Sequence, residues 1–307
     1  MQELIGNVKL NYQFYSGSDE YSDGDIEDEL LEIVKNNETK EFNHIIADRK
    51  NWAVLYHLSE IRNNILGVID FCGDESVLEI GSGCGAITGK LAASAKTVTC
   101  IDLSKKRSLI NAYRNKEKDN IEILVGNFET IEKGLEEKYD IITLIGVFEY
   151  AQYYISSNNP YGDFLQMVKK HLKPNGKIII AIENKFGMKY WAGCKEDHLN
   201  EFFVGIEGYQ NVNRAKTFSN NELKDFLEEQ NLSDYKFYYP YPDYKFATCI
   251  YSDEYLPQLG ELRNNMRNFD NDRLYLFDEG KAFDNVIKSG MFPFFSNSYL
   301  VVCGEDL

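Results

Sequence analysis

Residues 77–85 read Val77-Leu78-Glu79-Ile80-Gly81-Ser82-Gly83-Cys84-Gly85. The apolar run that leads into the first glycine predicts a buried strand over residues 76–80, and a helical pattern begins near residue 86. A glycine turn between a strand and a helix lets a ligand approach the backbone and leaves N–H groups facing it. The spacing is G-x-G-x-G, not the G-x-G-x-x-G of dinucleotide-binding proteins. A tight turn in another kind of α/β protein is the alternative.

The next predicted strand ends in an acidic residue. Thr97 to Ile101 is apolar and β-branched, and Asp102 follows about twenty residues after the glycine turn, as one strand–helix–strand unit requires. A carboxylate at this position can accept hydrogen bonds from both hydroxyls of a ribose. The alternative is a helix N-cap shared with Ser104, and the two roles are compatible. We therefore predict a nucleoside site that includes Asp102 and the adjoining Leu103.

The glycine turn, with an acidic residue ahead of it and Asp102 one strand later, resembles motif I of the class I S-adenosylmethionine (SAM)-dependent methyltransferases. The resemblance implies that SAM is the cofactor and S-adenosylhomocysteine the product. It also implies cofactor contacts from the residues of this motif, which are Glu79, Gly81, Gly83 and Gly85.

The third predicted strand, residues 121–125, is followed by Asn127 and Phe128. In the family that the chain resembles, a polar residue and then an apolar or aromatic one touch the adenine here. The commoner polar residue is Asp, which makes this part of the match less specific. Asn127 can still bond the adenine amino group through its amide oxygen. Phe128 would stack on the ring or cover it.

Two more strands complete the recognisable pattern. The fourth strand, residues 139–145, begins with Tyr-Asp. The fifth strand, residues 178–182, follows a Leu-Lys-Pro-Asn-Gly turn. The family that the chain resembles shares both features. The loop from Gly146 to Tyr154 leaves the carboxyl end of the fourth strand, where ligands bind in open α/β sheets, so Gly146 joins the predicted cofactor site. We predict an α/β fold with a doubly wound, seven-stranded, Rossmann-like sheet.

The chain divides by pattern into four parts. Residues 1–70 read as an N-terminal helical cap, 71–182 as the SAM-binding core, 183–216 as a substrate-side insertion, and 217–307 as the rest of the core with a second insertion over 240–294. His57 and Arg62 lie on the predicted cap. An arginine there could pair with the carboxylate of the SAM methionine group, although packing is the alternative for each residue.

Composition narrows the class of protein. The 307 residues carry a formal net charge of −16, which opposes a nucleic-acid partner because phosphate neutralisation needs Lys and Arg. The six cysteines are scattered without a C-x-x-C pair, which indicates reduced thiols. No signal peptide or membrane span is recognisable, so we expect a cytoplasmic protein.

The chain also resembles bacterial methyltransferases that are encoded with, or fused to, glycosyltransferases in surface-polysaccharide clusters. This resemblance runs from about Tyr21 to Cys303. It implies a sugar or glycan acceptor and a glycosyltransferase partner. Both implications rest only on the occurrence of the similar proteins in those clusters. The stretches that carry it are residues 56–59, the Gly81 loop, 144–151, 182–190, 196–198, 205–209 and 241–245.

The candidates for acceptor chemistry lie in the insertions. His198 is our first choice for a general base, Asp197 is the second, and Glu183 could hold an acceptor hydroxyl; a hydrogen-bonded structural histidine is an equally weighted alternative. Tyr209, Asp243 and Lys245 are predicted acceptor contacts, with packing as the alternative. We see no decisive Asp/Asn cluster and expect no metal.

Three other functions remain open on sequence alone. The main rival is a small-metabolite N-methyltransferase, the second is a catalytically inactive SAM-fold interaction protein, and the third is a different enzyme on the same sheet, such as an NAD-dependent oxidoreductase. The intact glycine loop and Asp102 argue against the second.

Overall fold

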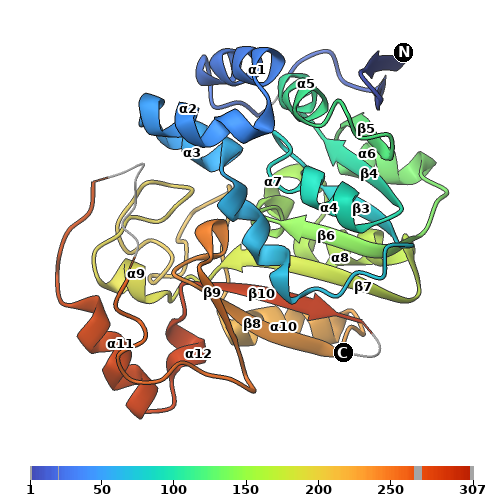
Figure 1. The fold of residues 1–307 in the computed structure, drawn as a ribbon. Helices are drawn as coiled ribbons and strands as arrows, with labels where there is room; N and C mark the ends of the chain where they lie inside the picture. The colour runs from blue at the N-terminus through green and yellow to red at the C-terminus, as the bar shows by residue number, and fades with distance from the viewer. Residues whose placement is uncertain (1, 20, 266–271, 305–307) are drawn as a thin grey trace. The chain divides into compact units, whose positions relative to one another are not determined.

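The computed structural model describes residues 2–19, 21–265 and 272–304. Figure 1 shows the fold of the chain as a ribbon. By its contacts, the chain divides into two compact units. Unit 1 comprises residues 1–144 and 167–178, and unit 2 comprises residues 145–166 and 179–307. The predicted cap, residues 1–70, therefore belongs to the same unit as the predicted SAM-binding strands. Both predicted insertions belong to unit 2.

Unit 1 contains a parallel sheet around β3. Its strands follow the order β1-β2-β5-β4-β3-β6. β3 pairs in parallel with β4 on one side and with β6 on the other. The strands that follow β3 in the sequence therefore lie on both sides of it, so the strand order reverses at β3. Ligands of open α/β sheets bind at such a point, outside the carboxyl ends of the strands. The elements are β1 (Gln2–Ile5), β2 (Val8–Phe14), α1 (Ile26–Asn36), η1 (Thr39–Glu41), α2 (Phe42–Arg49), α3 (Trp52–Leu58), η2 (Glu60–Val68), β3 (Ser76–Ile80), α4 (Thr88–Ser94), β4 (Thr97–Asp102), α5 (Lys105–Arg114), β5 (Ile121–Gly126), α6 (Phe128–Ile131), η3 (Glu132–Gly134) and β6 (Tyr139–Ile145).

The N-terminal helices pack onto the glycine loop and α5. Leu30, Val54, Leu58, Cys84 and Ile110 belong to one buried apolar cluster, which α1, α3, the loop and α5 share. The apolar face of α1 that the sequence predicted, with Leu30, Ile33 and Val34, is buried in this cluster. The cap is thus part of the core of unit 1 because it covers apolar surface that the loop and α5 would otherwise expose.

Two strands at the N-terminus were not predicted. β1 and β2 form an antiparallel hairpin, and β2 pairs in parallel with β5. The side chains of Val8 and Leu10 are fully buried, whereas Lys9 between them is exposed. This alternation is the pattern of a strand with one covered face.

Unit 2 contains an antiparallel group of strands. Along the sheet the order is β7-β10-β8-β9, and β8 pairs antiparallel with both β10 and β9. β6, α8 and β7 run across the boundary between the units. The elements are η4 (Phe148–Tyr150), α7 (Ala151–Tyr154), α8 (Pro160–Lys170), β7 (Leu172–Glu183), α9 (Met188–Trp191), α10 (Asn220–Glu229), β8 (Tyr235–Tyr241), η5 (Tyr244–Phe246), β9 (Cys249–Ser252), α11 (Glu279–Lys288), α12 (Phe292–Phe295) and β10 (Ser298–Cys303).

The described residues form ten strands, whereas the sequence predicted seven. The five strands predicted above by residue range are present as β3 to β7, and β8 and β10 follow in the C-terminal part of the predicted core. The three additional strands are the β1–β2 hairpin and β9, which lies within the predicted insertion 240–294. All six cysteines are free thiols. No described helix is both long enough and apolar enough to cross a membrane.

Candidate functional site

The glycine loop lies at the carboxyl end of β3 in unit 1. Gly81, Gly83 and Gly85 all have positive φ, at 71°, 51° and 75°, a region that residues with a Cβ rarely adopt. A Cβ built on Gly83 would meet no atom within 4 Å, whereas one on Gly85 would lie 2.3 Å from Asn111 Oδ1. The third glycine therefore permits close packing of the loop on α5. The second presents open backbone, as the approach of a ligand requires.

Asp102 lies beside the open part of this loop. Its Oδ2 accepts a hydrogen bond from the Gly83 N–H (2.7 Å), and its Oδ1 accepts one from the Ser104 N–H (2.9 Å). Burial raises the pKa of Asp102 above its usual 3.8, although these N–H groups and Arg107 oppose that rise. The carboxylate thus ties β4 to the loop. Each oxygen keeps a further lone pair for a ligand hydroxyl.

Glu79 lies within β3, below the loop. Its Oε2 accepts hydrogen bonds from Thr88 Oγ1 (2.6 Å) and Cys100 Sγ (3.4 Å). Burial raises the pKa of Glu79 to about 7, despite those bonds. Glu79 therefore fixes the start of α4 relative to β4. Its predicted contact with the cofactor stays a prediction.

The two residues predicted to contact adenine follow β5. Asn127 is the N-cap of α6, where its Oδ1 accepts from the Glu129 N–H (2.9 Å). Phe128 is 6 % exposed, and its ring meets the ring of His171 edge-on. Leu103 is half-buried next to Asp102. These residues lie beyond the carboxyl ends of neighbouring strands of unit 1, as predicted.

Two residues of the predicted cap have roles in the fold of unit 1. His57 Nε2 is 2.9 Å from Asp23 Oδ2, and Arg107 binds the same oxygen at 2.8 Å. Arg62 is buried with its guanidinium 4.0 Å from the centre of the Tyr56 ring. Each side chain packs within the N-terminal region. The predicted pairing of Arg62 with the SAM carboxylate remains a prediction.

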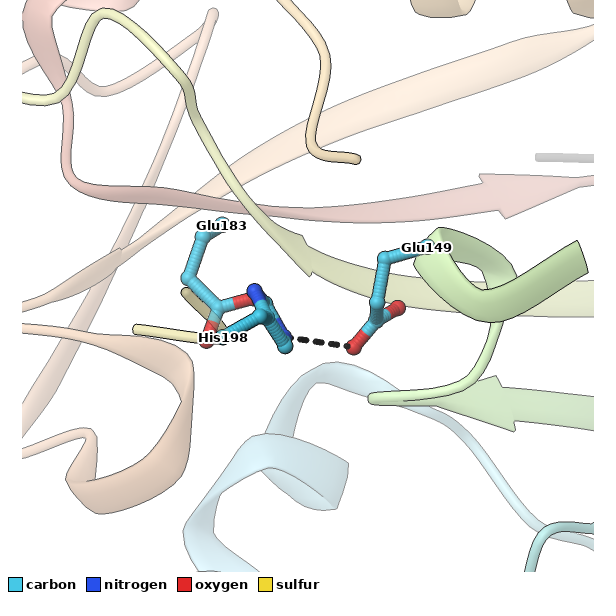
Figure 2. A group of neighbouring side chains, drawn as sticks. All are labelled: Glu149, Glu183 and His198. Atoms are coloured by element: carbon cyan, nitrogen blue, oxygen red, sulfur yellow. Dashed lines mark ion pairs between the residues drawn. The ribbon is translucent and has the colours of Figure 1, made fainter. Parts of the chain in front are cut away.

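A cluster of buried charged side chains lies in unit 2 and is called the charged cluster below. Its centre is His198, whose Nδ1 is 2.9 Å from Glu196 Oε1 and whose Nε2 is 3.5 Å from Glu149 Oε1 and 4.0 Å from Glu183 Oε2. Figure 2 shows the imidazole between Glu149 and Glu183. Five carboxylates face two ammonium groups and one imidazole. The members are Glu149, Glu183, Lys189, Glu196, Asp197, His198, Asp243 and Lys245.

Different elements position these residues. Glu183 is the last residue of β7, and Glu149 is in η4. His198 lies in a loop that an isolated bridge between Lys195 and Phe202 closes. Lys245 is in η5, after Asp243, which is the N-cap of η5 and accepts from the Lys245 N–H (2.9 Å). The cluster therefore depends on segments that are distant in sequence.

Ion pairs link the rest of the cluster to this centre. Lys245 pairs with Glu183 and with Asp197 Oδ1 (2.7 Å). Lys189 pairs with Asp197 Oδ2 (2.9 Å) and Asp243 Oδ2 (2.8 Å). Burial alone would raise the pKa of Asp197, but Lys189 and Lys245 hold it well below 3.8. Asp197 is thus an ionised partner of two lysines, which does not suit it to accept a proton.

The carboxylates around His198 bear on the role predicted for it. Burial alone would lower the pKa of His198, but Glu149, Glu183 and Glu196 outweigh that effect and raise it well above 6.5. The same three carboxylates therefore favour the protonated imidazole. A protonated imidazole has no lone pair for an acceptor proton, and the role of His198 as a general base stays a prediction.

The predicted acceptor contacts are already engaged within unit 2. The Tyr209 hydroxyl is 2.6 Å from Thr217 Oγ1 and 3.1 Å from Glu196 Oε1. Asp243 and Lys245 are in the ion pairs described above. These contacts give all three residues a structural role, and substrate contact stays a prediction.

Gly146, with φ 70°, donates its N–H to Ala181 O (2.9 Å), and a Cβ there would lie 2.8 Å from the Tyr244 hydroxyl.

The structure brings together the three predicted catalytic residues, His198, Asp197 and Glu183. Sequence reasoning missed Glu149, Lys189 and the role of Glu196. Glu149 lies in the loop after β6, which the sequence had marked as a ligand-binding edge, so its position was a usable signal. No sequence signal indicated Lys189, because a lysine in a polar insertion is normally interpreted as a solvated side chain.

Comparison with known proteins identifies the class of enzyme. Residues 78–178 match a family model described as a methyltransferase domain. The ribosomal RNA small subunit methyltransferase A of Borrelia garinii subsp. bavariensis is 23% identical over 205 residues, which cover 62% of this chain and 68% of that protein. The ubiquinone biosynthesis O-methyltransferase of Rickettsia akari is 30% identical over 157 residues, which cover 51% of this chain and 58% of that protein. The chain is a SAM-dependent methyltransferase.

The fold of this methyltransferase is shared with solved structures. The crystal structure of a SAM-dependent methyltransferase from Archaeoglobus fulgidus aligns with a TM-score of 0.51 at 13% identity, covering 83% of this chain and 100% of that chain. SAM is the cofactor, and the residues at the glycine loop of unit 1 are suited to bind it. The open backbone at Gly83 lies next to the Asp102 carboxylate, and both are at the point where the strand order reverses.

Proposed function

We propose that this methyltransferase transfers the methyl group of SAM to a hydroxyl of a sugar or glycan intermediate, and that the charged cluster is its acceptor side. The observation that carries the proposal is a buried carboxylate with an unengaged oxygen. Glu183 is 0 % exposed, and its Oε2 makes no hydrogen bond to any described residue. A buried acceptor oxygen without a partner is costly, and the hydroxyl of a ligand satisfies it.

The charges of the cluster favour this class of acceptor. The excess of carboxylates disfavours a phosphate or carboxylate acceptor. A polyhydroxyl ligand carries no charge and can both donate to carboxylates and accept from ammonium groups. The aromatic ring of Tyr150, edge-on to His198, adds an apolar wall beside these groups.

The proposed reaction is an in-line displacement. Bound SAM supplies an electrophilic methyl group on a sulfonium. An acceptor hydroxyl oxygen would form the new C–O bond as the C–S bond breaks, and S-adenosylhomocysteine would leave with the electron pair of that bond. The hydroxyl proton passes to the unengaged Oε2 of Glu183. Alignment and proton removal are the two contributions that the chain's residues make.

The sugar identity rests on the resemblance to methyltransferases of surface-polysaccharide clusters. The same resemblance supports a glycosyltransferase partner. The relative from Borrelia is a ribosomal RNA methyltransferase by name, but the net charge of −16 opposes an RNA acceptor here.

A product assay tests the proposal. The protein is incubated with methyl-labelled SAM and, separately, with sugar nucleotides, oligosaccharides and small amines, and the labelled product is located by NMR. We expect an O-methyl sugar, and Glu183→Gln should lower turnover about 10²–10⁴-fold while the dissociation constant of SAM is unchanged. Glu207→Gln, an exposed residue of the same insertion, is the matched control. Methylation of amines alone would replace the proposal with the N-methyltransferase alternative.

A further inference from the structure

Glu149, Glu183 and His198 present three potential metal ligands to one point in unit 2 (Figure 2). One ligand atom from each residue lies within 4.8 Å of the other two. The His198 Nε2 is 3.5 Å from Glu149 Oε1 and 4.0 Å from Glu183 Oε2. Direct N–H···O hydrogen bonds measure about 2.7–3.2 Å, so these atoms are not in close contact. Neighbouring ligands of an ion about 2.1 Å from each would be roughly 3–3.5 Å apart, a small adjustment from this arrangement.

The carboxylates also have oxygens that no described residue satisfies. Glu149 Oε2 and Glu183 Oε2 are buried and make no hydrogen bond to any residue that the structure describes. Glu149 is 1 % exposed and Glu183 is 0 % exposed, so bulk water does not compensate. Buried carboxylates with unused lone pairs are expected to be paired or to coordinate a metal.

The orientation of His198 is that of a metal-binding histidine. Its Nδ1 is 2.9 Å from Glu196 Oε1, which leaves Nε2 facing the two glutamates. Glu196 is itself fixed by the N–H groups of His198 and Leu199, both at 2.8 Å. Metal-ligating histidines almost always donate their other ring N–H to a carboxylate or carbonyl, which sets the tautomer and the ring orientation. The cluster supplies that arrangement.

The charge balance allows an additional cation. The five carboxylates of the charged cluster outnumber the ammonium groups of Lys189 and Lys245 by three. Lys245 faces the other oxygen of Glu183 and keeps its second pair with Asp197, so the lysine and the ion occupy different sides of the carboxylate.

We propose that Glu149, Glu183 and His198 bind one divalent first-row transition ion. Two carboxylates and one imidazole suit Mn²⁺ or Zn²⁺ better than Mg²⁺ or Ca²⁺, which prefer oxygen ligands throughout. Three protein ligands leave coordination positions open. The role of the ion rests on the proposed function and changes one step of it. An acceptor hydroxyl bound at an open position of the ion is held in place and becomes acidic enough to lose its proton to water, so that Glu183 Oε2 serves as a ligand of the ion and not as the proton acceptor. This site differs from the sequence-based expectation of no metal.

Metal binding is measured first, without SAM or acceptor. The full chain is stripped with a chelator and titrated with Mn²⁺, with free Mn²⁺ followed by electron paramagnetic resonance and the competition of Zn²⁺ measured by calorimetry. We expect one ion per chain. Glu183→Gln and His198→Ala should weaken Mn²⁺ binding at least 10-fold, and Glu196→Gln, which acts through His198, about 10–100-fold. Glu207→Gln and His44→Ala, both exposed, are the matched controls and should bind as the wild type does.

Folding is checked in every variant by its affinity for S-adenosylhomocysteine and by its thermal unfolding. The proposal is overturned if the wild type binds neither Mn²⁺ nor Zn²⁺, or if folded Glu183→Gln and His198→Ala bind them unchanged. The role is tested with the acceptor found above: Mn²⁺ should restore turnover to the stripped protein, and full turnover in excess chelator would refute the role. If the protein binds Mn²⁺ but methylates no hydroxyl, the proposed function fails while the metal site stands.

Discussion

Lys245 is a buried cation whose loss should weaken unit 2. Its side chain is 13 % exposed, and its ammonium pairs with Glu183 and Asp197, which are 0 % and 14 % exposed. Lys245→Met keeps most of the aliphatic volume but leaves two carboxylates without this partner. Breaking a buried pair by removing one member costs about 3–5 kcal/mol, because the remaining charge is desolvated and unpaired. We expect the free energy of unfolding of unit 2 to fall by that amount.

A surface lysine provides the control. Lys236 pairs with Glu254 at 2.9 Å, and their side chains are 28 % and 77 % exposed. Exposed pairs contribute about 0.2–1 kcal/mol, since water and salt screen them. Lys236→Met should therefore change the stability of unit 2 by less than about 1 kcal/mol.

The two tryptophans allow each unit to be followed. Trp52 is in unit 1 and Trp191 is in unit 2. In a Trp52→Phe background, fluorescence during urea unfolding reports on the surroundings of Trp191. With a slope of about 2–3 kcal/mol per M, Lys245→Met should lower the urea midpoint by about 1–2.5 M. Equal midpoints for Lys245→Met and Lys236→Met would refute the reasoning that the cluster is a coupled, buried set of charges.

Three further predictions concern unit 1. Asp102→Ala should weaken SAM binding by about 1–3 kcal/mol through lost charge-assisted hydrogen bonds; unchanged affinity by calorimetry would contradict the ribose role. Glu79, with a pKa raised from 4.5 to about 7 in the fold, stabilises the protein fully below pH 4.5 and loses that contribution as pH rises through 7. The shift corresponds to about 3 kcal/mol, so stability measured by Trp52 fluorescence should fall less from pH 5 to pH 8 in Glu79→Gln; equal falls would count against the raised pKa. Gly85→Ala should destabilise the protein by more than Gly83→Ala, because only the former meets Asn111, and melting temperatures that rank the other way would be inconsistent with the loop geometry.

The glycine loop and Asp102 of unit 1 could be predicted because the sequence signals for them are local. The strand before Gly81, the turn itself and Asp102 lie within one strand–helix–strand unit, where hydrophobic periodicity and glycine chemistry determine the backbone. β1 and β2 were missed although Val8 and Leu10 alternate with polar residues. The segment is short, and it becomes a strand because β5 offers an edge to pair with.

The sequence alone determined the parallel strands, the glycine loop and the acid at the end of β4. Tertiary structure alone decided that Glu149, Glu183 and His198 meet, and that Lys245 pairs with Glu183. The physical reason is that these residues come from η4, the end of β7, a loop and η5, whose meeting depends on long-range packing. Their protonation is decided by the same packing, because burial and three neighbouring carboxylates, not residue type, set the pKa of His198.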